Sequence, residues 1–365
     1  MIGFDEVTKR FPDGTVAVDN LSLEVPSGTL TVFVGPSGCG KTTSMRMINR
    51  MVDPTSGSVT VDGADVSRTN PVKLRLGIGY VIQSAGLMPH QRVIDNVATV
   101  PVLKGQSRRA ARKSALEVLE RVGLDPRLST RYPAQLSGGQ QQRVGVARAL
   151  AADPPILLMD EPFSAVDPVV REELQAEMLR LQNELHKTIV FVTHDIDEAV
   201  KLGDKVAVFG PGGSLQQYDP PARLLSNPAN DFVSGFIGAD RGYRELQFYH
   251  ATGLPLHDVR RVTEAEVDGL RLGPNEWVLM CKPDGSPLGW LDGAGMKRHR
   301  EGKLLYESVV AGGSLFHPDG TLRQALDAAL SSPSGVGLAV DERGRVVGGV
   351  AATDVLGALQ AQRQG

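Results

Sequence analysis

The chain has 365 residues, of which 41% are hydrophobic and 22% charged, and its formal net charge is −3. This composition is typical of a globular protein of about two or three domains, and the charge gives no overall indication of nucleic-acid binding. No uncharged apolar run approaches the roughly 20 residues that span a bilayer, and the first residues show no secretory pattern. The cysteines, Cys39 and Cys281, suggest no disulfide framework. We therefore expect a cytoplasmic protein that reaches a membrane only through a partner.

Short apolar runs rich in β-branched residues alternate with helical stretches as far as about residue 210. The runs TLTVFVG, IGYVIQ, PILLMD and TIVFVTH predict buried strands at 29–35, 78–83, 155–160 and 188–194. The segment 171–187 predicts an amphipathic helix. This alternation favours an α/β fold, with residues 84–150 as a helical subdomain inserted into it.

The segment GPSGCGKTT, residues 35–43, directly follows the first of these strands and precedes the helical SMRMINRM. It fits the pattern G-x-x-x-x-G-K-[ST] in the context that this pattern requires. Glycines let backbone N–H groups curl around phosphates, Lys41 can neutralise the β- and γ-phosphates, and the Thr42 hydroxyl can ligate Mg²⁺. The predicted nucleotide-binding residues are Gly35, Pro36, Ser37, Gly38, Cys39, Gly40, Lys41, Thr42 and Thr43.

Polar side chains follow three later strands. Asp160 and Glu161 end PPILLMDEP, and because parallel strands place ligands at their C-terminal ends, Asp160 is expected beside the Mg²⁺. Glu161 is then placed to act on the attacking water as general base. His194 ends FVTH and is expected at the γ-phosphate. Gln83 ends IGYVIQ and is expected to sense the metal or the water, although a glutamine at a strand end is a weak indication alone.

The segment LSGGQQQRVGVARAL, residues 136–150, predicts a helix with Ser137 as its N-cap. Free N–H groups and the helix dipole favour an anion at such an end. No general base, metal cluster or nucleophile pair lies beside it in the sequence. The alternative is an ordinary capped helix.

Together these segments resemble the nucleotide-binding subunit of ATP-binding cassette (ABC) transporters over about residues 1–235. GPSGCGKTT resembles the Walker A loop, ILLMDEP the Walker B strand and LSGGQ the signature. Gln83 resembles the Q-loop glutamine, SAVD with Asp167 the D-loop, and His194 the switch histidine. Phe11 resembles the aromatic residue that stacks on adenine, and the alternative is an edge residue of the first strand.

The resemblance implies an ATPase that works as a head-to-tail dimer. Ser137, Gly138, Gly139 and Gln140 would then contact the γ-phosphate of ATP bound to the partner subunit. It also implies that residues 84–100 receive a short helix from transmembrane permease subunits. Leu87, Met88 and Pro89 are candidates for that apolar seat, or for packing inside the helical subdomain.

A closer resemblance links the segments around LSGGQ and FVTHD to the importers of quaternary-amine osmoprotectants. This implies uptake of glycine betaine, carnitine, choline or proline betaine, with an extracytoplasmic substrate-binding protein involved indirectly. The chain would lie peripherally on the cytoplasmic face of the membrane. The alternatives are an importer for another small solute, such as an amino acid, and a soluble ABC ATPase acting on nucleic acid. The latter is disfavoured because there is one cassette and no strong basic balance.

After residue 238 the pattern changes. We expect a domain at 239–365 made of weakly similar copies at about 244–308 and 309–365, or else one irregular α+β domain. The copies resemble tandem cystathionine-β-synthase-type (CBS) motifs. The nucleotide pattern G-x-x-[ST]-x-x-D reads Gly348, Ala351 and Asp354 in the second copy, which lacks the hydroxyl, and it is absent after Gly289 in the first. Standard adenosine binding is therefore not expected.

The basic run KRHREGK, residues 297–303, lies in the first of these copies. It could meet anionic lipid, an attraction that salt screens over a Debye length of about 8 Å. A cyclic dinucleotide is the other ligand that the resemblance implies for this domain. The alternatives are a solvated loop at 297–303 and a domain that only holds a dimer together.

Overall fold

The computed structural model describes residues 1–83, 86–164, 166–273 and 275–364. The chain splits into two compact units, Met1–Ala239 (unit 1) and Asp240–Gly365 (unit 2). Each unit has its own strands, helices and apolar core.

A six-stranded sheet forms the centre of unit 1, in the order β10–β9–β3–β8–β7–β6. All neighbours are parallel except β10 and β9. Every residue of β3, β7 and β8 is buried, as expected for strands with helices on both faces. The strands are β3 (Leu30–Val34), β6 (Ile78–Val81), β7 (Ile156–Asp160), β8 (Thr188–Val192), β9 (Lys205–Phe209) and β10 (Leu215–Asp219).

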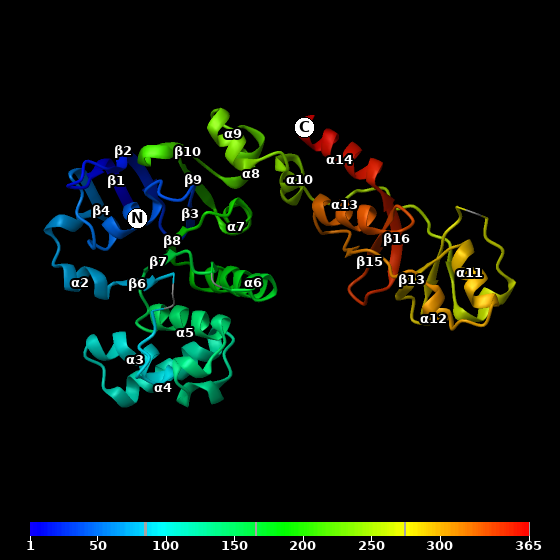
Figure 1. The fold of residues 1–365 in the computed structure, drawn as a ribbon, viewed down its shortest axis with the longest axis horizontal. Helices are drawn as coiled ribbons and strands as arrows, with labels where there is room; N and C mark the ends of the chain where they lie inside the picture. The colour runs from blue at the N-terminus through cyan, green and yellow to red at the C-terminus, as the bar shows by residue number, and fades with distance from the viewer. Residues whose placement is uncertain (84–85, 165, 274, 365) are drawn as a thin grey trace. The chain divides into compact units, whose positions relative to one another are not determined.

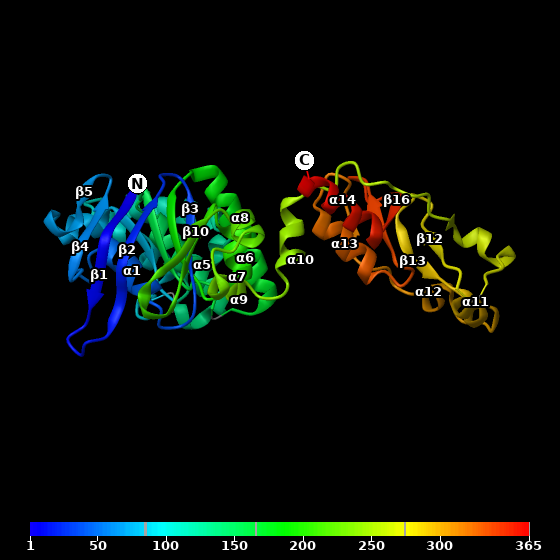
Figure 2. The same cartoon turned by 90° about the horizontal axis from the view of Figure 1, so that it is seen from above.

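A second, antiparallel sheet has the order β2–β1–β4–β5 and lies at one end of unit 1 (Figure 2). Its strands are β1 (Ile2–Arg10), β2 (Val16–Val25), β4 (Ser56–Val61) and β5 (Ala64–Asp65). Alternate side chains of β1 and β2 pack with Phe33 and Phe209 of the central sheet. The two sheets therefore share one apolar core.

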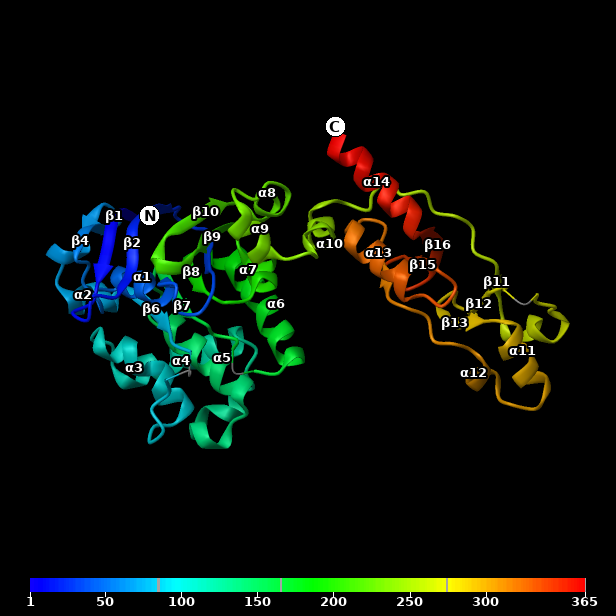
Figure 3. The same ribbon diagram turned by 45° about the horizontal axis from the view of Figure 1, so that its top comes forward.

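The predicted helical subdomain is formed by α3 (Val93–Leu103), α4 (Arg108–Arg121) and α5 (Gly138–Leu150), with short 3₁₀ helices at Pro126–Thr130 and Pro133–Gln135. Figures 1 and 3 both show α3, α4 and α5 grouped on one side of the central sheet. Proline at position 101 lies inside α3. The other helices of unit 1 are α1 (Lys41–Ile48), α2 (Pro71–Leu76), α6 (Pro168–Leu185), α7 (Ile196–Leu202), α8 (Pro221–Ser226) and α9 (Asp231–Ile237), with 3₁₀ helices at Val66–Arg68 and Pro211–Gly213.

Unit 2 contains a repeated pattern. The sheets β11–β12–β13 and β14–β15–β16 each have one parallel pair followed by one antiparallel pair. A helix follows the last strand of each sheet, and apolar side chains from both sheets form one cluster that includes Leu279, Trp290 and Leu338. The first copy has a 3₁₀ helix at Glu264–Gly269 where the second has the longer α13 (Figure 3).

The strands of unit 2 are β11 (Arg261–Val262), β12 (Val278–Cys281), β13 (Pro287–Leu291), β14 (Leu315–Phe316), β15 (Val336–Val340) and β16 (Val346–Ala351). Its helices are α10 (Arg241–Glu245), α11 (Gly293–Arg300), α12 (Leu305–Ser308), α13 (Leu322–Ser331) and α14 (Ala352–Gln364), with a 3₁₀ helix at Leu246–Phe248. Among the described residues of both units, no helix has the length and apolar character needed to cross a membrane.

Candidate nucleotide-binding site

The glycine-rich loop lies between β3 and α1. Gly35, Gly38 and Gly40 have φ values of 152°, 79° and 89°, a region that favours glycine. Space also requires glycine at two of these positions. A Cβ on Gly35 would lie 2.3 Å from the Phe209 carbonyl oxygen, and one on Gly40 would lie 1.9 Å from that of Ala17. Backbone atoms of β9 and β2 therefore lie directly against the loop and limit its conformation.

The loop forms a cradle of about 200 Å³ lined by Ala17, Ser37, Gly38, Cys39, Gly40, Lys41, Thr42, Thr43 and Glu161. The buried Lys41 donates from Nζ to the carbonyls of Gly35, at 2.7 Å, and Pro36, at 2.8 Å. These are bonds that a phosphate oxygen can replace, because an ammonium group is a strong donor to anions. The cradle therefore fits a polyphosphate.

Cys39 lies in the phosphate loop, but its thiol is buried. Its side chain is 2% exposed and belongs to the apolar core with Met45 and Phe209. Burial raises the pKa of the thiol, although the nearby Lys41 opposes this effect. A thiol reagent is therefore expected to react slowly with Cys39 whether or not nucleotide is bound. Cys39 nevertheless lines the cradle, with its Sγ 3.6 Å from Lys41 Nζ.

Thr42 and Asp160 meet across the sheet. The Thr42 hydroxyl donates to Asp160 Oδ1 at 2.8 Å, which brings the first residues of α1 to the end of β7. Arg46, one turn further along α1, places a guanidinium nitrogen 3.6 Å from Asp160 Oδ2. Burial raises the pKa of Asp160, and the Thr42 hydrogen bond and Arg46 partly offset this. A cation beside this carboxylate would lower the cost of its charge.

Glu161 lies at the centre of a second group. Its Oε2 is 3.3 Å from Gln83 Nε2 and 3.3 Å from His194 Nδ1. Its backbone has φ 44°, which is strained for a residue with a side chain, and its N–H donates to the Val192 carbonyl at 2.9 Å. Ser164 donates to its carbonyl at 3.0 Å. The carboxylate is therefore held at the edge of the phosphate cradle.

Two strand ends differ from the sequence prediction. Strand β6 ends at Val81 and β8 at Val192, so Gln83 and His194 lie in the loops that follow. The order β3–β8–β7 explains why the loops still converge, because β8 lies between the two strands that carry the phosphate loop and the carboxylates. The sequence does not indicate this order.

The LSGGQ segment begins α5 as predicted. Ser137 is the N-cap and its hydroxyl accepts from the Gln140 N–H at 3.3 Å, while the Gln140 side chain accepts from the Ser137 N–H at 3.1 Å. Gly138 is exposed, but Gly139 is buried. A Cβ on Gly139 would lie 2.4 Å from a methyl carbon of Val170, so glycine at this position also lets α5 pack closely against α6.

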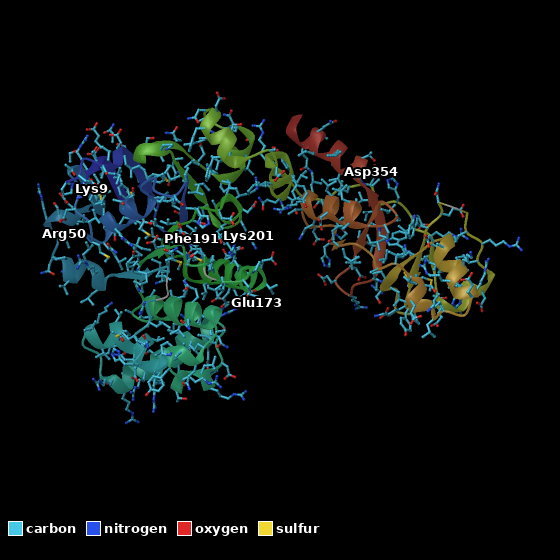
Figure 4. All side chains as sticks on the ribbon, in the orientation of Figure 1. Lys9, Arg50, Glu173, Phe191, Lys201 and Asp354 are labelled. Atoms are coloured by element: carbon cyan, nitrogen blue, oxygen red, sulfur yellow. The ribbon has the colours of Figure 1, made fainter. Side chains whose placement is uncertain are left out.

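Two further predicted site residues do not line the phosphate cradle. Phe11 is 37% exposed in the turn after β1, with Lys9 Nζ (labelled in Figure 4) 5.3 Å from its ring centroid. Asp167 is the N-cap of α6 and accepts from the Val170 N–H at 3.1 Å. Neither the adenine role nor the D-loop role is tested by these contacts.

The sequence reasoning missed several polar residues around the site. Arg46 lies four residues after Thr42 on the same face of α1, a spacing that could have revealed it. Asn96 is fully buried in α3 and bonds both backbone atoms of Met88 and the carbonyls of Gln91 and Arg92. The feature of the sequence that could have revealed Asn96 is an asparagine inside the largely apolar segment VIDNVATV.

A family model described as "ABC transporter" matches residues 18–164. The osmoprotectant import ATP-binding protein OsmV of Salmonella typhimurium is 44% identical over 300 residues, covering 75% of this chain and 78% of that protein. The glycine betaine uptake system ATP-binding protein YehX of Escherichia coli is 45% identical, covering 74% and 88%.

The chain belongs to the ABC transporter family. This membership confirms the family resemblance found in the sequence. The carnitine transport ATP-binding protein OpuCA of Listeria monocytogenes is 50% identical over 241 residues, covering 66% of this chain. This match spans only 60% of that relative's length.

Solved structures show the same family fold for unit 1. The dimeric ATP-binding cassette MJ0796, bound to ADP and Pi, is 34% identical with a TM-score of 0.56, covering 60% of this chain and 99% of that one. The structure of cbiO1 from Clostridium perfringens is 28% identical with a TM-score of 0.58, covering 62% and 91%. The P-loop ATPase fold predicted for this ABC protein is thereby confirmed, whereas the CBS-type character of unit 2 is not addressed.

Proposed function

We propose that this chain is the ATP-hydrolysing subunit of an importer for quaternary-amine osmoprotectants. The observation that carries the cargo class is its identity of 44–50% to proteins named for osmoprotectant, carnitine and glycine betaine transport. Nothing in the cassette contacts the cargo, so it works with transmembrane permease subunits, and indirectly with an extracytoplasmic substrate-binding protein. The chain would lie peripherally at the cytoplasmic face of the membrane.

The phosphate cradle supports the ATPase activity. Backbone N–H groups of residues 35–43 would hold the β- and γ-phosphates, and Lys41 would exchange its carbonyl partners for phosphate oxygens. The Thr42 hydroxyl and the Asp160 carboxylate lie 2.8 Å apart. The side chain of Gln83 lies close by, where its amide donates to Glu161. These hard oxygen donors fit Mg²⁺, which is usually held by few protein groups together with substrate phosphates. When bound, it would neutralise developing phosphate charge.

Glu161 is proposed as the general base. Its carboxylate lines the cradle, so it can take a proton from a water that attacks the γ-phosphate. His194 and Gln83 contact the same carboxylate oxygen and would orient it, and His194 would also contact the γ-phosphate. The strained backbone at Glu161 is held by bonds to Val192 and Ser164, which keeps the carboxylate from swinging away.

We infer that two copies form the working unit, head to tail. The N-terminus of α5, with the exposed Ser137 and Gly138 followed by Gly139 and Gln140, would complete the ATP site of a partner copy. Asp167 would lie at the same interface. Phe11 would stack on adenine. The dimeric cassettes among the similar solved structures support this arrangement.

A groove of about 410 Å³ in the helical subdomain is the proposed seat for the permease. It is lined by His90, Gln91, Arg92, Asp95, Ala98, Thr99, Val102, Leu103, Arg108, Arg112 and Tyr132. Of the residues expected from the sequence, Leu87 packs partly against the core, and Met88 is held by Asn96, which leaves Pro89 exposed beside the groove-lining His90.

Unit 2 is proposed as a regulatory pair of CBS-type copies. The repeated strand order and the helix after each third strand support this assignment. Asp354 already accepts from the Ala351 N–H at 3.0 Å and contacts His257 Nε2 at 2.9 Å, which supports the expectation that adenosine is not its ligand. A cyclic dinucleotide and anionic lipid remain the proposed ligands of this pair.

The test is transport by the full chain assembled with its permease in vesicles. ATP-dependent uptake of labelled glycine betaine, choline or carnitine would support the proposal. ATP turnover without uptake of any of them would refute the cargo class while leaving the ATPase. A second candidate cargo is trimethylamine N-oxide, because the trimethylamine N-oxide transport protein TmoW of Ruegeria pomeroyi is 47% identical over 238 residues. The same assay includes it.

A further inference from the structure

A cluster of buried polar side chains lies behind His194. Glu198 is 6% exposed, Gln175 5% and Thr193 2%. The Glu198 carboxylate accepts from the Thr193 hydroxyl at 2.6 Å and from Gln175 Nε2 at 3.3 Å. A buried carboxylate is costly unless such bonds and an opposite charge compensate it. None of these three residues is among the site residues predicted from the sequence.

Arg171 provides the opposite charge. Its Nε is 3.9 Å from Glu198 Oε1, and its Nη1 is 3.9 Å from Asp195 Oδ2. Burial raises the pKa of Glu198, an effect that the Thr193 bond and Arg171 oppose. The carboxylate is therefore kept at a cost in stability, which is typical of groups retained for function.

The cluster fixes the backbone on both sides of His194. The Thr193 hydroxyl, whose proton is donated to Glu198, accepts from the Asp195 N–H at 3.0 Å. A hydroxyl has a single proton. Because Thr193 donates that proton to Glu198, its hydroxyl oxygen is left to accept from the Asp195 N–H. His194 lies between these two residues, and its Nδ1 is 3.3 Å from Glu161.

The same cluster reaches the segment before α6. Gln175 and Arg171 both lie on this helix, and Arg171 Nη2 donates to the Val166 carbonyl at 3.5 Å. Val166 directly precedes Asp167, the N-cap of α6. One network of contacts thus runs from the start of α6 to the histidine at the phosphate cradle.

We propose that Glu198 is a positioning residue that holds His194 in register with Glu161 and ties it to the first turns of α6. Glu198 acts through Thr193 and does not contact the cradle. The inference rests on the proposed ATPase function, in which His194 contacts the γ-phosphate. It predicts that Glu198 matters for turnover only while His194 is present.

The test is a double-mutant cycle on the full chain, with ATP turnover measured for Glu198→Ala, His194→Ala and both together. We expect Glu198→Ala to lower kcat by about 10- to 100-fold with KM for ATP within about threefold. In the His194→Ala background the same change should lower kcat by less than about twofold, because residues that act as a unit are not additive. Glu198→Gln, which keeps an acceptor for Thr193, should recover a large part of the loss.

A matched control is Gln182→Ala. Gln182 is also buried on α6, but it donates to the carbonyls of Gly28 and Lys187, away from His194. It should lower the melting temperature without lowering kcat. Should Glu198→Ala fail to fold, Thr193→Val removes the same hydroxyl link with little change of shape and should show the same non-additivity.

Two outcomes would overturn the inference, and they are distinguishable from failure of the proposed function. Equal losses of kcat in both backgrounds would show that Glu198 does not act through His194. An unchanged kcat in Glu198→Ala or Thr193→Val would show that the cluster is structural. If His194→Ala itself keeps full turnover, the proposed role of His194 is wrong and the positioning role of Glu198 falls with it.

Discussion

The Glu161→Gln substitution tests the proposed chemistry most directly. Glutamine has the same size and keeps one oxygen that can accept from Gln83 or His194, which both lie 3.3 Å from the carboxylate. The backbone bonds to Val192 and Ser164 involve main-chain atoms of position 161 and are unchanged. The fold and the phosphate cradle should therefore persist.

What the substitution removes is the ability to take a proton. A positioned general base contributes about 10²–10⁴-fold, which corresponds to about 3–5 kcal/mol of transition-state stabilisation. We expect phosphate release to fall by that factor while ATP binding is retained. Because ATP is bound but not hydrolysed, an ATP-bound dimer should accumulate.

The assay measures steady-state phosphate release, together with the elution volume of the chain on gel filtration with and without ATP. Glu173→Gln is the matched control, because the exposed Glu173, labelled in Figure 4, does not line the phosphate cradle. Its carboxylate forms an ion pair with Arg143 at 3.4 Å. That variant should keep full turnover. A Glu161→Gln protein that retained more than about a third of wild-type turnover would refute the role of general base.

Three further predictions concern stability. Asp160→Asn should raise the melting temperature of the nucleotide-free chain and abolish turnover. Burial raises the pKa of Asp160 above its ordinary value, so the wild-type chain loses stability as the pH rises from that ordinary value through the raised pKa. Gly40→Ala should unfold the phosphate loop, since its φ of 89° costs about 1–2 kcal/mol and its Cβ meets the Ala17 carbonyl. The bonds from the Ala351 N–H and His257 lower the pKa of Asp354, so unit 2 should lose their contribution as the pH falls through that lowered pKa, a loss absent in Asp354→Asn.

Each of these three predictions has a direct check. The prediction for Asp160→Asn is checked by thermal unfolding at several pH values. It would be wrong if this variant and the wild type were equally stable at neutral pH. Gly63→Ala is the control for the second, because Gly63 has a φ of 78° and nothing within 4 Å of the added Cβ, and it does not line the cradle. It should bind ATP, and equal loss in both variants would refute the clash with Ala17. For the third, an acid unfolding profile of Asp354→Asn identical to wild type would refute the pairing.

The sequence predicted the phosphate loop because all of its determinants are local. A buried strand, three glycines with left-handed backbone and the first turn of α1 follow one another within residues 30–48. The contact between Thr42 and Asp160 is different. Its two residues are far apart in the chain, and the sequence indicated it only through the rule that parallel strands end at the same edge.

Residues whose roles depend on tertiary packing could not be predicted. Glu198 and Asn96 lie in α7 and α3, and only the neighbouring residues of the fold reveal that each is buried and hydrogen-bonded on several sides. The burial of the Cys39 thiol also depends on packing. Cys39 lines the cradle as predicted from its place in the loop, but its thiol lies in the apolar core, where a Cβ on Gly35 would come within 2.9 Å of it.

The basic run of unit 2 requires a more selective test than its sequence suggests. Arg298 donates to the Ser308 carbonyl at 3.0 Å and Arg300 to the Leu270 carbonyl at 2.9 Å. Charge reversal at either position would therefore disrupt packing around α11 and confuse the result. Lys297 and Lys303 are exposed, and Lys297 has only a distant pair with Glu301 at 3.9 Å. These two lysines are the ones to reverse.

If the run meets anionic lipid, each lysine contributes about 1 kcal/mol. Each reversal changes the charge by two, so it should cost about 2 kcal/mol and weaken vesicle binding by roughly thirtyfold. Binding of the full chain to vesicles of phosphatidylglycerol and phosphatidylcholine, measured by sedimentation at several salt concentrations, gives this factor. Arg343→Glu in the exposed turn after β15 makes the same charge change elsewhere in unit 2. An equal loss in that control would mean that net charge alone governs binding. A loss confined to Lys297 and Lys303, and erased as salt screens the attraction, would place the sensing surface at the end of α11 and the turn that follows it.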